Sequence, residues 1–266
     1  MKFIIQHNLV NSYHLLEIKQ SIQNYPCEFI EIIPFSREII SNEPITGNDY
    51  IPYGSTSLTE TTAELGWKGN CFDLTKLNYK NFQQNRDDML NTNPVMKLVD
   101  AINFLKTRDK EELWFTRPSK DLKEYSGLVD ESEILVKWLE DRMLCASSGS
   151  YKLSHDTEIV IDIPKVIDSE YRWFIIDGKI ITGSMYRNNG QLFSQEILEQ
   201  SVINEAQVIA DKWLPMSNVV MDLALTPNGM KVIEFNCINS SGFYKCNIQK
   251  IFDAWWNYYQ RNDYVI

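Results

Sequence analysis

The chain has 266 residues, 44% of them apolar and 12% aromatic, which is enough to bury one large core or two smaller ones. Its formal net charge of −10 argues against a nucleic-acid surface, which normally shows a basic face. No stretch approaches the roughly 20 consecutive apolar residues that cross a bilayer, and the start MKFIIQHN turns polar too soon for a signal peptide. We therefore expect a cytoplasmic protein that binds neither nucleic acid nor membrane.

The first 90 residues predict a small α/β domain. Apolar runs at 2–7 and 27–35 are typical of buried strands, and residues 15–25 between them show helical spacing. A strand, helix, strand order is typical of a parallel α/β unit. The segment from 42 to 73 is rich in Gly, Pro and Thr, and it contains a short predicted helix that Thr59 or a neighbour would cap.

The rest of the chain predicts a larger domain that mixes helices with antiparallel strands. Helical spacing occurs at residues 95–106, 194–214 and 248–260. Strand-like runs occur at residues 112–118, 158–167, 171–187 and 219–236. The last two runs are predicted to be hairpins because each contains a tight-turn sequence, Asp177-Gly178 and Pro227-Asn228-Gly229. The pattern at 131–143 fits a helix or a strand.

The last hairpin carries three oxygen-bearing side chains. Asp222 is expected at the end of its first strand, and Glu234 and Asn236 alternate on its second strand, which places them on one face. Burying two carboxylates without compensation is costly, and a bound cation removes that cost. Oxygen-only ligation favours Mg²⁺ or Mn²⁺. A second interpretation stays open, in which the two carboxylates face solvent and Asn236 begins a loop.

This hairpin resembles the C-terminal signature of the ATP-grasp superfamily, which is an Asp, a hairpin turn and then Glu-x-Asn. The segment D-L-A-L-T-P-N-G-M-K-V-I-E-F-N matches that signature in spacing and residue type. The resemblance implies an α+β ATP-grasp fold at 91–266, preceded by a small pre-ATP-grasp-like α/β domain at 1–90. It divides the larger domain into a nucleotide-covering part, 113–166, and a metal- and substrate-binding part, 167–266. The side chains implied to hold Mg²⁺ and, through it, the phosphates of ATP are Asp222, Glu234 and Asn236.

The same resemblance assigns phosphate contacts to the run F-T-R-P-S-K-D-L-K-E-Y-S-G. In the family a strand commonly ends in Lys-Pro before a flexible loop, and here Arg117 stands in place of that lysine. This exchange, followed by Lys123, resembles a phage and bacterial clade named for one arginine and two lysines. A guanidinium contacts phosphate oxygens at two points, so the exchange preserves anion binding. Lys97 and Lys120 are further candidates. The alternatives are a surface ion pair for Arg117 and a solvated turn for the lysines.

The segment that begins I-P-K-V-I-D-S-E resembles the adenine hinge of the family, whose backbone groups pair with the base. By that match the hinge comprises Ile163, Lys165 and Val166 with the proline between them. Glu170 would then bind the ribose hydroxyls. Arg172 and Arg187, on opposite strands of the next hairpin, would converge on a phosphate or substrate anion. The alternative for both arginines is pairing with acidic neighbours across the sheet.

The resemblance implies an ATP-dependent ligase that forms an amide or peptide bond through an acylphosphate. Its substrates would be small-molecule or peptide carboxylates and amines, and its cofactors ATP with Mg²⁺ or Mn²⁺. After Asn236 the chain continues C-I-N-S-S-G-F-Y instead of the common Ser-Pro-Gly, so Asn239, Ser240 and Ser241 are candidates for shaping the acceptor site. A small-molecule kinase, a nucleotide-binding module without turnover, and a chance match in an unrelated acidic protein remain alternatives. The sequence carries no signal for the oligomeric state.

Overall fold

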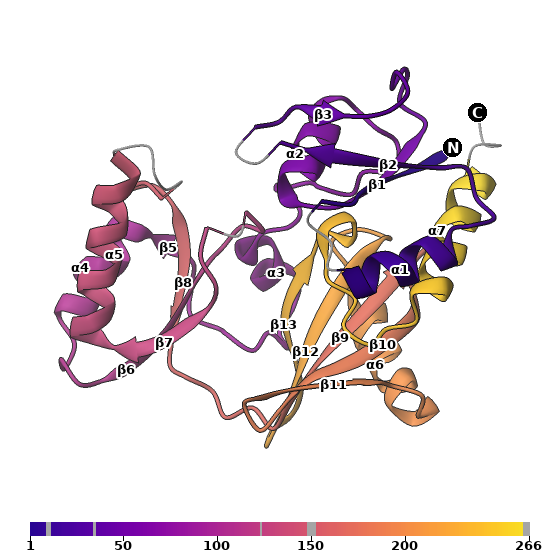
Figure 1. The fold of residues 1–266 in the computed structure, drawn as a ribbon. Coiled ribbons are helices and arrows are strands. Elements are labelled where there is room, and N and C mark those ends of the chain that lie inside the picture. Colours follow the sequence, from indigo (N-terminus) through magenta and orange to yellow (C-terminus); the bar gives the residue numbers. More distant parts are fainter. Residues whose placement is uncertain (9–11, 34–35, 123, 148–152, 263–266) are drawn as a thin grey trace.

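The structure, a computed structural model, describes residues 1–8, 12–33, 36–122, 124–147 and 153–262. These residues form three β-sheets with flanking helices (Figure 1). We call the sheets the N-terminal, middle and large sheets, in the order in which the chain builds them. None of the helices within these ranges is long and apolar enough to cross a membrane.

The N-terminal sheet has the strand order β3-β2-β1-β4, with β1 parallel to β2 and β4 and with β3 antiparallel to β2. Its elements are β1 (Lys2–Gln6), α1 (Ser12–Ser21), β2 (Cys27–Ile32), β3 (Ile39–Ile40), β4 (Tyr50–Tyr53) and α2 (Thr56–Glu64). A parallel α/β unit is therefore present, as the sequence predicts. Ser55 caps α2, because its hydroxyl accepts a hydrogen bond from the Leu58 N–H at 3.2 Å, whereas Thr59 lies buried inside the helix.

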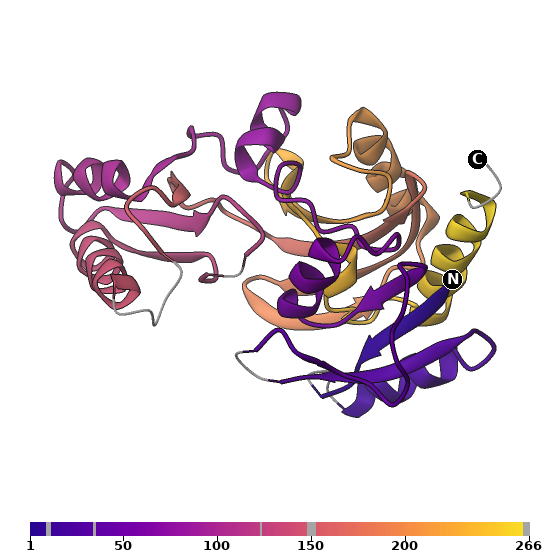
Figure 2. The ribbon, with the colours of Figure 1, turned by 90° about the horizontal axis from the view of Figure 1, so that it is seen from above.

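The middle sheet is antiparallel, with the order β5-β8-β6-β7, and two helices pack on it. Its elements are β5 (Met96–Lys97), α4 (Leu98–Lys106), β6 (Leu113–Pro118), β7 (Leu128–Glu131), α5 (Ser132–Ser147) and β8 (Glu158–Asp162). Residues 131–143, whose pattern fits a helix or a strand, lie almost entirely in helix α5. Seen from above, this sheet and its helices project to one side of the molecule (Figure 2).

The large sheet is antiparallel, with the order β11-β10-β9-β12-β13. Its strands are β9 (Ser169–Ile176), β10 (Lys179–Asn188), β11 (Gln191–Glu196), β12 (Val219–Thr226) and β13 (Gly229–Asn236). The accompanying helices are α3 (Tyr79–Asn85), α6 (Gln200–Lys212), a single 3-10 turn η1 (Ile238–Ser240) and α7 (Ile248–Asn262). Both predicted hairpins are present. In the first, Asp177 and Gly178 have positive φ angles of 55° and 72°, as a tight hairpin turn requires.

The two faces of the large sheet pack against different partners. Trp173 and Met221 on one face belong to a core that includes α3 and α6 residues. Phe174 and Val220 on the other face belong to a core that contains Phe3 of β1 together with α7. The N-terminal sheet therefore shares a hydrophobic core with the large sheet, whereas the middle sheet and its helices have a core of their own.

Two predicted helices begin later than their sequence pattern indicates. The residues up to Glu196 in the predicted helix 194–214 extend β11, which pairs with β10, and α6 begins at Gln200. In the predicted helix 95–106, Met96 and Lys97 pair with β8 and α4 begins at Leu98. In both places pairing with a neighbouring strand overrides the local helical spacing.

Candidate active site

A row of charged residues crosses the large sheet on the face that packs against the N-terminal unit. Asp222 in the middle of β12 lies directly opposite Arg172 of β9 on one side and Glu234 of β13 on the other. Directly opposed residues point to the same face of a sheet, so all three side chains project together. Asp222 and Asn236 are each 1% exposed and Asn236 belongs to β13, so the interpretation in which Asp222 faces solvent and Asn236 begins a loop is wrong, whereas the Glu234 side chain is 18% exposed.

Arg172 holds Asp222 with a two-point ion pair. Its Nε donates to Oδ1 at 2.9 Å, and its Nη2 donates to Oδ2 at 2.7 Å. Asn236 Nδ2 donates to the same Oδ2 at 3.2 Å. Burial would lower the pKa of Arg172, but Asp222 outweighs it and keeps that pKa well above its ordinary value. A guanidinium therefore compensates the buried carboxylate in this structure.

Two stacked tyrosine rings lie against the Arg172 guanidinium. Its centre lies 5.0 Å from the ring centroid of Tyr244 and 5.8 Å from that of Tyr186. The rings themselves stack at 4.8 Å, with an interplanar angle of 9°. Tyr244 adopts a φ of 51°, a conformation that is uncommon for a residue with a side chain. These contacts hold Arg172 in one orientation.

Arg117 joins the middle sheet to the large sheet. It projects from β6, forms an ion pair with Glu234 of β13, and lies over the ring of Tyr79 at 5.4 Å. Burial would lower the pKa of Arg117, but Glu234 raises it above its ordinary value. Arg117 thus stays charged. The alternative interpretation for Arg117 was an ion pair at the surface, and the ion pair in the structure is partly buried.

A cavity of about 500 Å³ separates the two sheets at this point. The middle sheet and the segment after it contribute Arg117, Gly127 and Lys165, and the large sheet contributes Glu170 with the charged row. The lining includes four cationic side chains, Arg117, Lys165, Arg172 and Arg187. Together with Asp222 and Glu234, these side chains make a mixed-charge cleft that is suited to a polyanion and a divalent cation.

The predicted hinge lies at one edge of the cavity and is fixed by Asp162. Asp162 Oδ1 accepts hydrogen bonds from the Ile163 N–H at 2.7 Å and from Lys165 Nζ at 3.0 Å, while Oδ2 accepts from the Thr92 N–H at 2.6 Å. Because the Ile163 N–H already donates to Asp162, the backbone groups of the hinge that can bind a ligand lie after Ile163 in the chain. The side chain of Val166 is exposed and lines a neighbouring cavity.

Glu170 and Arg187 lie across from each other at the other edge. Arg187 Nε is 3.3 Å from Glu170 Oε1, and the Tyr186 hydroxyl donates to Glu170 Oε2 at 2.7 Å. Arg172 and Arg187 therefore both form ion pairs with acidic neighbours across the sheet, which was the alternative interpretation. Both also line the cavity, which binding of an anion there requires.

Several predicted residues do not line the cavity, among them Ile163, Val166 and Asn236. Lys97 is exposed, and its Nζ pairs with Asp156 at 2.8 Å. Asn239 is fully buried, and its amide nitrogen donates to the carbonyls of Pro52 and Gly69 at 2.7 and 2.9 Å, so it ties the N-terminal unit to the large sheet. Lys120 is exposed and does not line the cavity. Lys123 lies outside the described residues.

Residues 64–255 match a family model described as the ATP-grasp domain of R2K clade family 3. The chain belongs to this ATP-grasp family. The family and its clade are those that the hairpin D-L-A-L-T-P-N-G-M-K-V-I-E-F-N and Arg117 indicate in the sequence. The match begins at the last residue of α2 and ends within α7, so it includes both sheets that face the cavity.

Solved ATP-grasp structures resemble this one in fold at low sequence identity. A D-cycloserine synthetase is 10% identical with a TM-score of 0.57, and the match covers 91% of this chain and 92% of that one. A D-alanine–D-alanine ligase from Bacillus anthracis is 14% identical with a TM-score of 0.57, covering 98% of each chain. The ATP-grasp ligase PsnB, in a complex with a precursor variant, Mg and ADP, is 12% identical with a TM-score of 0.53, covering 97% and 99%. No curated protein sequence matches significantly.

Several residues of the site in this ATP-grasp chain had no signal in the sequence. Tyr186 of β10 and Tyr244 of the loop before α7 lie about 60 positions apart, and both contact Arg172 of β9. Asp162 acts through its contacts with the segment after α3. Gly127 could have been identified as the one glycine of the predicted phosphate loop. A Cβ at that position would lie 2.9 Å from the Phe115 ring, so a larger residue would crowd the cavity wall.

Proposed function

We propose that this chain is an ATP-dependent ligase that joins a carboxylate to an amine, with the nucleotide bound between the middle and large sheets. The observation that carries the proposal is the convergence of Asp222, Glu234 and four cationic side chains on one cavity. The ATP-grasp family of the chain supports it, and so do fold relatives that are named as ligases. A triphosphate and a divalent ion would satisfy both signs of charge in this cleft.

Each part of ATP has a counterpart in the cavity wall. We propose that the adenine base forms hydrogen bonds with backbone groups of Lys165 and Val166, since the Ile163 N–H is already occupied. Glu170 would accept hydrogen bonds from the ribose hydroxyls. Arg117 and Arg187 would contact phosphate oxygens, because each reaches the cavity and a guanidinium suits phosphate geometry. Arg172, held by Asp222 and two tyrosine rings, would position that carboxylate and bind the substrate anion.

The residues present fit a divalent cation. Asp222, Glu234 and Asn236 supply oxygen donors from neighbouring strands, and Mg²⁺ is commonly bound by one or two carboxylates together with phosphates and waters. Within the described ranges no group of three or more His, Cys, Asp or Glu side chains could hold a metal ion. An ionised carboxylate has about four acceptor positions, so it can keep its arginine and also bind a metal. When bound, Mg²⁺ or Mn²⁺ would neutralise charge on the phosphate oxygens.

The chain's side chains would then serve two steps. A substrate carboxylate oxygen attacks the γ-phosphorus, the bond to the bridging oxygen breaks, and ADP leaves, giving an acylphosphate. An amine nitrogen then attacks the acyl carbon, phosphate departs with the C–O electrons, and the nitrogen gives up one proton. Arg117 and Arg187 hold the transferred phosphoryl group, and no side-chain nucleophile is needed, so catalysis rests on placement and electrostatics.

The arrangement of the three sheets supports the assignment of different functions to different parts of the chain that the sequence suggests. We propose that residues 113–166 cover the nucleotide and that 167–266 bind metal and substrate, within an ATP-grasp domain at 91–266 after an N-terminal domain at 1–90. The N-terminal domain would hold the large sheet in place, since the two share one core.

The test is ADP release from Mg-ATP with a panel of amino acids and peptides, together with detection of the amide product. We expect Glu234→Gln to lower kcat by at least about 100-fold, because it removes a ligand that acts on the transferred charge. Glu111→Gln, an exposed change outside the cavity, should leave the rate unchanged. Equal rates in Glu234→Gln and wild type would refute the metal assignment, and a phosphorylated product without amide would indicate a kinase.

A further inference from the structure

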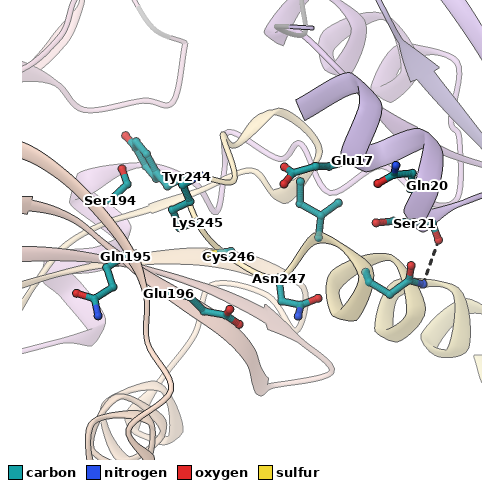
Figure 3. A pocket seen from close by; sticks show the side chains of 12 residues that line it. Glu17, Gln20, Ser21, Ser194, Gln195, Glu196, Tyr244, Lys245, Cys246 and Asn247 are labelled. Atoms are coloured by element: carbon teal, nitrogen blue, oxygen red, sulfur yellow. Dashed lines mark hydrogen bonds between the residues drawn. The ribbon is translucent and has the colours of Figure 1, made fainter. Parts of the chain in front are cut away.

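A second cavity of about 580 Å³ lies beside the proposed nucleotide site, between α1, the end of β11 and the loop that leads into α7. Figure 3 shows Glu17 and Gln20 projecting from α1, and Gln195 and Glu196 standing on β11 across from them. The loop residues from Tyr244 to Asn247 complete the wall. The lining is mostly polar, so this cavity suits a hydrophilic ligand.

The wall of this cavity is fixed before any ligand binds. The backbone N–H groups of Lys245 and Asn247 donate to the hydroxyls of Ser184 and Thr182 on β10, at 3.3 and 3.0 Å. The Gln249 amide donates to the Ser21 carbonyl at 3.1 Å, which ties the start of α7 to the end of α1 (Figure 3). A preorganised wall reduces the cost of binding.

The two cavities meet at Tyr244, which lines both. Cys246, two residues further along this loop, lines the second cavity, and its Sγ donates to the Arg172 carbonyl at 3.8 Å. Burial raises the pKa of its thiol, Arg172 lowers it, and Asp222 and Glu196 raise it. Because the Tyr244 ring also lies 5.0 Å from the Arg172 guanidinium, a molecule in the second cavity would lie next to the Arg172–Asp222 pair, where the proposed acylphosphate forms.

Two carboxylates give the second cavity its charge. Glu17 and Glu196 come from different elements, and both are half-buried. Over the described part of the chain neither carboxylate has an ion-pair or hydrogen-bond partner, and with Lys245 they leave the lining net negative. Half-buried carboxylates in this setting favour a cationic ligand.

We propose that this cavity binds the acceptor of the ligase reaction, and that the acceptor carries a positively charged group in addition to the amine that reacts. Diamines and other basic amines belong to this class. The cationic group would lie between Glu17 and Glu196, and the reacting amine would point past Tyr244 towards the nucleotide cavity. The reaction step rests on the proposed function, whereas the binding step does not.

The test is calorimetric binding of 1,4-diaminobutane to the full chain without nucleotide, with butylamine as the matched monoamine. We expect the diamine to bind at least about tenfold more tightly than butylamine, and Glu17→Gln and Glu196→Gln each to weaken diamine binding by about tenfold. Glu196→Lys should abolish diamine binding. Glu205→Gln, which removes an exposed charge on α6 outside both cavities, should change nothing.

Equal affinity for the two amines, or unchanged diamine affinity in both Gln variants, would overturn the proposal. Thermal unfolding midpoints equal to wild type would show that the variants are folded. Because no nucleotide is present, the result does not depend on the proposed reaction. A chain that binds diamine through Glu17 and Glu196 but releases no ADP would refute the ligase function and leave the cation site in place.

Discussion

At the scale of single residues, the Arg172–Asp222 pair decides how the site must be tested. Asp222→Ala would leave a buried guanidinium without its partner, which costs roughly 3 to 5 kcal/mol of unfolding free energy. We expect the double variant Asp222→Leu with Arg172→Met to cost clearly less than the sum of Asp222→Leu and Arg172→Met alone. Denaturant unfolding of all three variants measures this coupling. Additive costs would show that the pair is not an energetic unit.

Three of the residues at this scale can be predicted from the sequence because they lie in one hairpin. Strand alternation and a short turn place Asp222, Glu234 and Asn236 together, and the structure gives them that arrangement. Their cationic partners cannot be predicted this way. Arg172 and Arg117 arrive from a neighbouring strand and from another sheet, so their pairing depends on tertiary structure.

At the scale of elements, Arg86 and Asp88 attach the segment after α3 to the end of α6. Arg86 donates to Asp88 at 2.8 and 2.9 Å and to the carbonyls of Ile209 and Trp213, and Lys212 donates to Asp88 at 2.8 Å. Burial would raise the pKa of Asp88, but these hydrogen bonds outweigh it and lower the pKa to about 2.

A lowered pKa in the folded state means that Asp88 stabilises the protein above its ordinary pKa and loses that contribution as the pH falls towards 2. We expect Asp88→Asn to lower the unfolding free energy by about 2 kcal/mol at pH 7, with a difference from wild type that shrinks between about pH 5 and 2. Urea unfolding across this pH range measures the effect. Asp87→Asn, an exposed neighbour, is the control, and a pH-independent difference would contradict the ionic explanation.

Elements were predictable where local turn chemistry determines them. The Asp177-Gly178 turn and the hairpin after β12 follow from residues that favour those turns. The start of α6 was not predictable. Ser194, Gln195 and Glu196 fit a helical pattern, but they belong to strand β11, which pairs with β10. The local sequence pattern carries no information about pairing with another strand, so it could not predict that these residues join β10.

At the scale of the whole molecule, the arrangement of the sheets explains why two cavities meet at Tyr244. The middle sheet has its own core and meets the large sheet through contacts such as the Arg117–Glu234 ion pair. The N-terminal sheet shares a core with the large sheet, so α1 and the loop before α7 form a fixed second cavity. Nucleotide and acceptor would thus enter from opposite sides of Tyr244.

The proposed function requires that a nucleotide and a divalent ion bind together on Asp222, Glu234 and Asn236. Calorimetric titration of ATP into wild type and Glu234→Gln, with and without Mg²⁺, tests it most directly. We expect Mg²⁺ to tighten ATP binding at least about tenfold in wild type, and Glu234→Gln to lose most of this gain. Equal affinity with and without Mg²⁺ in wild type, or the same Mg²⁺ dependence in the variant, would contradict it.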